Sequence, residues 1–223
     1  MDWNWTAIAV VVLAVALLSV VQWRDMGRRR AARQQILDLV QPLLTEPKAG
    51  VDAQGFPHLE GRYRGRRVRL ELILDQLAWR KLPALWLLAT AYGPTQARST
   101  LDILLRPLGQ ESWSPSQSLE HDVAHPAGWP AHIAIRTDDP AGLPPLEAIE
   151  TQRAFLDEPR AKAITVTRRG VRLVALTHEA RRAHYLVLRD AELGDFQVPR
   201  AEAEALLDRA VALLGALERQ EAA

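Results

Sequence analysis

An uncharged run of 21 residues, Trp3 to Trp23, constrains this chain more than any other feature. As an α-helix, such a run extends about 31 Å, close to the hydrocarbon thickness of a bilayer. Ten Ile, Val and Leu residues lie between Ile8 and Val21, and no polar face exists that would suit a buried helix of a soluble core. We therefore expect a transmembrane anchor with Trp at both interfaces, represented by Trp5, Ile8, Leu13, Leu17 and Trp23.

The flanks of this run favour an uncleaved signal-anchor over a removed export signal. A signal peptide has a basic start, a shorter apolar stretch and a small-residue cleavage site. Here Asp2 precedes the run, and "QWRDMGRRR" follows it. Lys and Arg occur only on the C-terminal side, at Arg24 and beyond. The positive-inside rule then predicts a single-pass protein of a bacterial inner (cytoplasmic) membrane, with its N-terminus outside and its C-terminal domain in the cytoplasm.

Charge is unevenly distributed although the net charge is only +1. Residues 24–33 carry +4 and residues 62–69 carry +5, so the rest of the chain carries −8. This pattern suits a domain held beside an anionic leaflet, and ordinary scatter of surface charge explains it equally well. The chain has no Cys, which excludes disulfides, thiolate metal sites and Cys nucleophiles.

Hydrophobic periodicity predicts an α+β domain after the anchor. Apolar residues at helical spacing predict a helix over 28–44, with Pro42 at its end, and "TEPKAGVDAQGFP" has the composition of a loop. Alternation and apolar runs predict two hairpins and further strands. The predicted elements are a hairpin over 58–74 turning at Gly65, strands at 82–92, 99–106 and 131–137, a helix at 146–156, a hairpin over 163–177 turning near Gly170, a strand at 183–191 and a C-terminal helix beginning at Pro199.

These elements favour an antiparallel sheet with helices packed on one face. The predicted organisation is an anchor at 1–23, a basic, amphipathic juxtamembrane helix at 24–45 and a cytoplasmic α+β domain at 46–223. The order helix, hairpin, strand occurs twice, which raises a possible αβββ duplication with halves at about 28–106 and 131–223. A Pro-, Gly- and Ser-rich loop, 107–130, would separate these halves.

A cluster of arginines on the first hairpin is one candidate partner site or anion site. It could contact anionic lipid headgroups, a protein partner or nucleic-acid phosphates, although a single nearby Tyr63 disfavours base stacking. A solvated strand face is the simpler interpretation. The cluster consists of Arg62, Arg64, Arg66, Arg67 and Arg69.

Two further groups complete the candidate partner surface. Trp79, Arg80 and Lys81 precede the most apolar strand and could form an anion or peptide site, or a structural corner closed by Asp75 and Arg80. Trp113 and Trp129 flank the long loop; they would mark a partner surface if exposed, or attach the loop to the sheet if buried.

A metal-dependent enzyme is a weaker alternative. "EHDVAH" places His121 and His125 four residues apart, which is the spacing of a two-His zinc site on a helix, and His132 could be a third ligand. Pro126 follows at once, and the flanks are typical of a loop.

The sequence contains no Gly-rich phosphate loop, dinucleotide fingerprint or GxSxG nucleophile motif. We therefore expect a membrane-tethered, non-enzymatic interaction or assembly module without a cofactor. Its expected partners are the bilayer and a membrane-associated protein, with anionic-lipid binding as an alternative.

Overall fold

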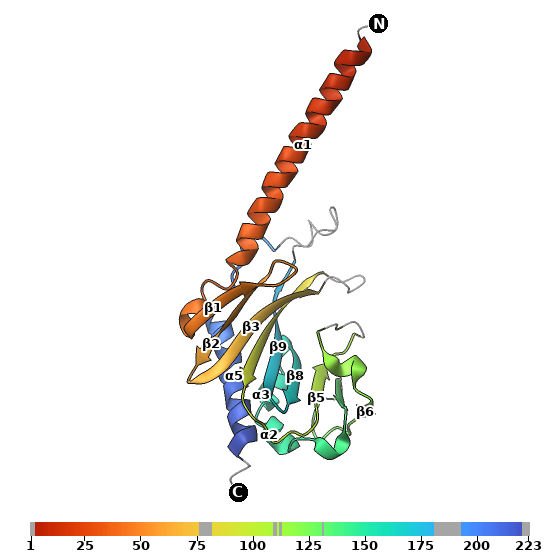
Figure 1. Cartoon of the computed structure of the whole chain (residues 1–223). Coiled ribbons are helices and arrows are strands. Elements are labelled where there is room, and N and C mark those ends of the chain that lie inside the picture. Colours follow the sequence, from red (N-terminus) through yellow and green to blue (C-terminus); the bar gives the residue numbers. More distant parts are fainter. Residues whose placement is uncertain are drawn as a thin grey trace.

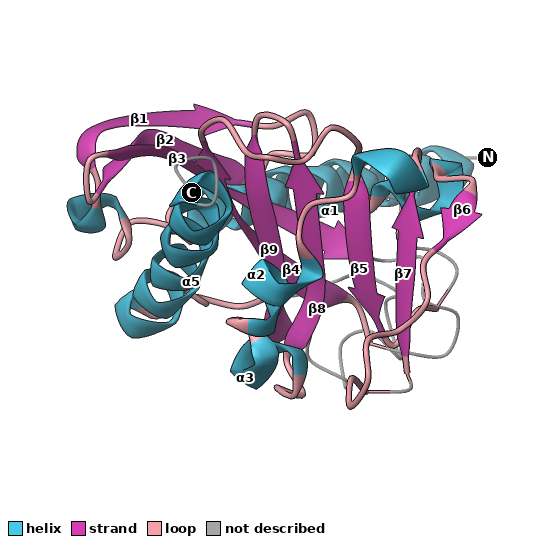
Figure 2. Ribbon diagram, turned by 90° about the horizontal axis from the view of Figure 1, so that it is seen from below, coloured by secondary structure: helices cyan, strands magenta, loops and turns pink. Residues whose placement is uncertain are grey.

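The computed structural model describes residues 3–75, 82–108, 111, 113–130, 132–180 and 193–219. A long N-terminal helix projects from a body built around one sheet (Figure 1). Helices cover one face of that sheet (Figure 2). The predicted α+β class, with an antiparallel sheet and a single apolar N-terminal helix, is confirmed.

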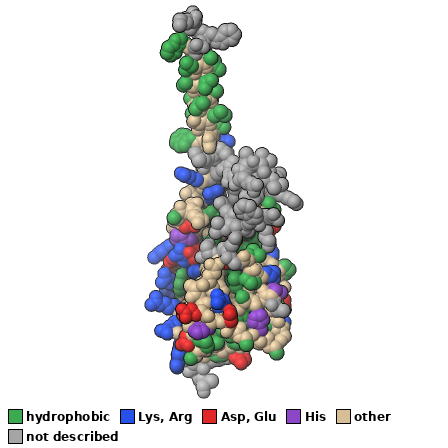
Figure 3. Space-filling view, turned by 90° about the vertical axis from the view of Figure 1, so that its right-hand side faces the viewer, with side chains coloured by type: hydrophobic (Ala, Val, Ile, Leu, Met, Phe, Trp, Pro, Cys, Tyr) green, Lys and Arg blue, Asp and Glu red, His purple; other side chains and the backbone are tan. Residues whose placement is uncertain are grey.

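The projecting helix, α1, runs from Trp3 to Gln34. Its segment Ala7–Arg24 has a mean hydropathy of 2.1 and none of it is buried, so by length and composition it can cross a membrane. Figure 3 shows apolar side chains along this helix and basic ones where it meets the body. The predicted helix over 28–44 is wrong beyond Gln34, because turns follow and a 3-10 helix, η1, spans Gln41–Leu43 around Pro42.

Among the described residues, nine strands form one sheet in the order β1-β2-β3-β4-β9-β8-β5-β7-β6, with every pairing antiparallel. The two hairpins predicted from alternation, β2–β3 and β8–β9, are confirmed, and the apolar strand β4 lies between them. The strands are β1 Thr45–Val51, β2 Pro57–Tyr63, β3 Arg66–Asp75, β4 Ala84–Tyr92, β5 Leu101–Leu105, β6 His121–Asp122, β7 Ile133–Thr137, β8 Ala161–Thr167 and β9 Gly170–Glu179.

Four other predictions differ from the structure or lie outside it. The segment predicted as a loop contains edge strand β1, whose backbone pairs with β2 despite Pro47. The predicted helix at 146–156 is two short helices, α2 Leu146–Glu150 and α3 Arg153–Leu156. The long loop 107–130 contains the 3-10 helix η2, Pro115–Ser118, and strand β6. The predicted strand at 183–191 lies outside the described residues.

The C-terminal helix α5, Arg200–Arg219, packs on β4 and β9 and defines the covered face of the sheet. Its predicted apolar stripe is confirmed, because all six of its residues are buried in the main core: Leu206, Leu207, Ala210, Leu213, Leu214 and Leu217. The opposite face carries a smaller apolar cluster of Trp86, Leu88, Leu104, Ala163 and Val174.

Candidate functional site

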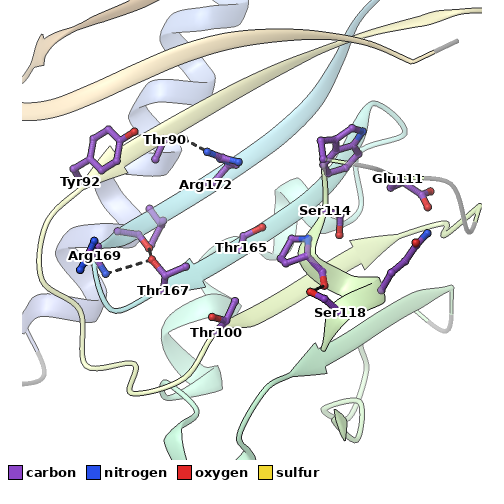
Figure 4. A pocket seen from close by; sticks show the side chains of 15 residues that line it. Thr90, Tyr92, Thr100, Glu111, Ser114, Ser118, Thr165, Thr167, Arg169 and Arg172 are labelled. Carbon is purple, nitrogen blue, oxygen red and sulfur yellow. Dashed lines mark hydrogen bonds between the residues drawn. The ribbon is translucent and has the colours of Figure 1, made fainter. Parts of the chain in front are cut away.

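A groove of about 700 Å³ lies on the sheet face opposite α5. Strands β4, β9 and β8 supply its floor, Thr100 lies beside them just before β5, and residues 113–118, here called the strap, supply one wall (Figure 4). Threonine and arginine side chains dominate the floor: Thr90, Thr165, Thr167, Arg169 and Arg172. This groove is the candidate functional site.

The strand register explains why polar side chains meet here. Because successive residues of a strand point to opposite faces, directly paired residues share a face and line up across the sheet. One polar row runs across eight strands in this way: Glu60, Arg69, Thr90, Arg172, Thr165, Asp102, Arg136 and Asp122.

Arg172 lies in the middle of this row. Its Nε donates to Thr90 Oγ1 at 3.0 Å, and its Nη2 lies 3.4 Å from Glu71 Oε2. Glu71 also pairs with Arg69 at 2.8 Å. The guanidinium is therefore held over the floor of the groove by neighbours on β3 and β4.

Asp102 is fully buried beneath the groove. Thr165 Oγ1 donates to one of its carboxylate oxygens at 2.7 Å, and Ser114 Oγ donates to the other at 2.6 Å. Burial raises the pKa of Asp102 above its ordinary value of 3.8, while the two hydroxyls and the nearby Arg172 act in the opposite direction. The Ser114 bond attaches the strap to the sheet.

This raised pKa predicts an unusual pH dependence of stability. The folded Asp102 keeps its proton at pH values where the unfolded one has lost it, so the native state binds more protons. Its contribution is therefore present at low pH and is lost as pH rises from 3.8 through the raised pKa.

We expect the unfolding free energy of wild type to fall relative to that of Asp102→Asn as pH rises over this range. Urea unfolding between about pH 4 and 8 measures the difference. Asp122→Asn is the matched control, because Asp122 lies in the same polar row and its side chain is 84% exposed. An unfolding free energy of wild type that rises relative to that of Asp102→Asn as pH rises would contradict the assignment.

A buried ion pair holds the chain just before the strap, at Glu111. Lys162 Nζ lies 2.7 Å from Glu111 Oε1, and the two residues are 4% and 3% exposed. Lys162 also donates to the carbonyl of Arg106 at 2.9 Å, and its ammonium lies 5.8 Å from the Trp86 ring centroid. The Lys162 and Glu111 charges therefore compensate each other. The pKa of Glu111 is lowered because Lys162 and the Leu108 N–H favour its ionised form over the opposing effect of burial.

The arginine cluster of the first hairpin divides between the two faces. Arg64 and Arg66 bind α5 through Asp208 at 2.8 Å and Glu218 at 2.6 Å. Tyr63 also donates to Asp208, at 2.6 Å. These contacts connect the hairpin to the C-terminal helix.

The remaining arginines of the cluster lie on the open face, which is the sheet face opposite α5. Arg67 and Arg69 pair with Glu60 at 3.3 and 2.8 Å, and Arg62 donates to the carbonyl of Gly65 at 3.3 Å. Four of the five cluster arginines thus have carboxylate partners within the domain, which reduces the charge available to an external anion.

The other sequence-predicted site residues do not converge on the groove, apart from Trp113. Trp113 lines it and packs on Trp86, with ring centroids 6.1 Å apart. Trp129 is buried in the main core and donates to Glu150. Trp79, Arg80 and Lys81 lie outside the described residues.

The three histidines are separated in structure. His121 lies on the two-residue strand β6, and the exposed His125 follows it in a non-helical segment. His132 Nε2 lies 3.4 Å from Arg106 Nη1. Within the described part of the chain, no three His, Asp or Glu side chains form a group that could hold a metal ion.

In the part of the chain that the structure describes, the architecture is that of an α+β protein with a nine-stranded antiparallel sheet, one helix-covered face and one projecting apolar helix. No family model and no curated protein matches the chain. Among solved structures it is similar to the mycobacterial trehalose monomycolate transport factor A, TtfA, with a TM-score of 0.44 and 11% identity over 87% of this chain and 95% of that one. A likeness this weak carries no functional argument.

The groove was not predicted from the sequence, although single polar residues inside apolar strands indicate it. Asp102 interrupts the apolar run "LDILL", and Thr90 interrupts "LLATAY". A polar side chain inside a buried strand needs a partner, which predicts a polar contact at that position. The identity of that contact depends on strand order.

Proposed function

We propose that the protein is a membrane-tethered, non-enzymatic interaction module that holds a membrane-associated protein partner beside the cytoplasmic face of the membrane. The observation that carries the proposal is the way α1 joins the body. Ile36, Leu37 and Val40, directly after the helix, are buried in the main core. The N–H of Val198 donates to the carbonyl of Ile36 at 2.9 Å, so the C-terminal segment also holds this junction.

The junction keeps the body close to the bilayer. Gln34, where α1 ends, lies ten helical positions beyond Arg24, at the end of the apolar segment. At about 1.5 Å per residue, they extend about 15 Å. A domain confined this close to a surface meets partners on that surface at a high effective concentration, without a strong intrinsic affinity.

The arginines around the junction support a cytoplasmic body. Arg24 ends the apolar segment, Arg28, Arg29, Arg30 and Arg33 follow it, and Lys and Arg are absent before it. We expect a C-terminal green fluorescent protein fusion to fluoresce and the matching alkaline phosphatase fusion to stay inactive. The reverse result would place the body on the other side of the membrane.

The partner itself is testable by photo-crosslinking in native membranes. A photoreactive residue at Gln117, in the strap, should yield one crosslinked product of defined mass. The same residue at the exposed Ala205, on α5, is the control for non-specific neighbours and should yield none. Equal products at both positions, or a clean monomer after gentle solubilisation in several detergents, would overturn the proposal.

A further inference from the structure

We propose that the groove on the open sheet face binds a phosphate-bearing ligand. This site goes beyond the tethering function above and does not depend on a protein partner. The argument compares the hydrogen-bond donors and acceptors of the lining side chains with the bonds they already make.

The lining carries cationic charge that its own carboxylate does not neutralise. Arg169 and Arg172 both line the groove, and Arg169 is exposed and forms no ion pair with any described residue. Glu111 is the lining carboxylate, and Lys162 at 2.7 Å and the Leu108 N–H at 2.7 Å already occupy its Oε1. Arg172 is paired with Glu71 at 3.4 Å, so the uncompensated charge is that of Arg169, and it favours an anionic occupant.

The acceptors beneath the groove are occupied as well. Asp102 accepts from Thr165 and Ser114, one hydroxyl on each carboxylate oxygen. Both carboxylate oxygens therefore already have hydrogen-bond partners within the fold. A ligand entering from the open side meets the guanidinium groups of Arg169 and Arg172, since Asp102 itself is fully buried.

Several donors lack an acceptor among the described residues. Thr90 Oγ1 accepts from Arg172, which leaves its own proton available to a ligand. The hydroxyls of Tyr92 and Thr100 make no hydrogen bond to any described residue, and the buried Nε1 of Trp113 has no partner either. Donors without an acceptor are unfavourable once shielded from water, and an oxygen-rich ligand would supply the missing acceptor.

The arrangement favours phosphate over a single carboxylate. In Figure 4, Arg169 and Thr167 lie at one end of the groove, Arg172 and Thr165 in the middle, and Ser114 on the strap at the other end. The guanidinium groups of Arg169 and Arg172 and the hydroxyl of Thr90 offer donors to the three or four oxygens of a tetrahedral anion, whereas a carboxylate has only two. The volume of about 700 Å³ exceeds a bare phosphate, so the apolar lining residues Trp113 and Pro115 would contact the organic part of an ester.

Calorimetry on the full chain in nanodiscs of neutral phosphatidylcholine tests this site, with glycerol 3-phosphate as the probe and glycerol as the uncharged control. Arg169→Gln should weaken glycerol 3-phosphate binding tenfold or more, because it removes a charged donor. Arg168→Gln is the matched control and should change binding less than about twofold. Arg168 is the neighbouring arginine, but its Nε donates to the carbonyl of Arg98 at 2.6 Å and it does not line the groove.

A second arm identifies the source of the phosphate. Nanodiscs containing phosphatidic acid are analysed by native mass spectrometry for lipid retained by wild type, Arg169→Gln and Arg168→Gln. Binding of glycerol 3-phosphate lost in Arg169→Gln supports a soluble ester, and retention of phosphatidic acid lost in Arg169→Gln supports a lipid headgroup. Binding of neither probe, or equal binding by both variants, overturns the proposal, and neither result bears on the crosslinking test of tethering.

Discussion

Replacing Lys162 with methionine is expected to lower the free energy of unfolding by about 3–5 kcal/mol. Lys162 and Glu111 form a nearly fully buried ion pair, so the substitution leaves the Glu111 carboxylate buried without its cation. The carbonyls of Leu105 and Arg106 also lose their donor. Urea unfolding of the full chain in mild detergent, followed by Trp fluorescence, measures the loss.

Two controls separate the buried charge from a general loss of a cation. The double variant Lys162→Met, Glu111→Leu should be less destabilised than Lys162→Met alone, because no charge is left uncompensated. Arg67→Met removes a cation whose side chain is 65% exposed and should cost less than about 1 kcal/mol. Equal losses for Lys162→Met and Arg67→Met would show that the buried pair contributes no more than a surface pair.

Replacing Gly170 with alanine is expected to destabilise the fold by about 3 kcal/mol or more. Gly170 begins β9 opposite Tyr92 and lines the groove. Its φ of +151° is one that L residues rarely adopt, and an added Cβ would overlap the carbonyl oxygen of Ala91. Since Ala91 lies in the central strand β4, the neighbouring backbone cannot move away without breaking sheet pairing.

Gly65→Ala is the matched control for this prediction. Gly65 also has a positive φ, +80°, but nothing lies within 4 Å of the position its Cβ would take. It should cost only about 1 kcal/mol, from backbone strain alone. Thermal unfolding of both variants in the same detergent gives the comparison, and equal shifts would mean that the contact with Ala91 is relieved at little cost.

Short-range patterns carried much of the correct prediction. The arginine-glycine turns between alternating strands identified both hairpins, and in the first hairpin Arg64 and Gly65 adopt the positive φ values that a tight turn requires. The six-residue apolar stripe of α5 likewise followed from its spacing. These features depend on contacts between near neighbours in the chain.

Edge strand β1 was missed for a physical reason. Its Pro47 and Gly50 are typical of loops, and its side chains are almost entirely exposed, so no alternation marks it. Its strand structure comes from backbone pairing with β2, for example between Ala49 and Leu59. Backbone pairing of this kind leaves no side-chain signal.

The amino-acid sequence by itself determined the apolar helix, the two hairpins, the amphipathic C-terminal helix and the α+β class, because each depends on periodicity within about twenty residues. Only the tertiary structure decided which polar side chains meet. Thr90 contacts Arg172 across 82 positions, and Asp102 contacts Thr165 across 63, through the strand order β4-β9-β8-β5. The groove exists because that order brings distant strands into register, and local periodicity contains no information about strand order.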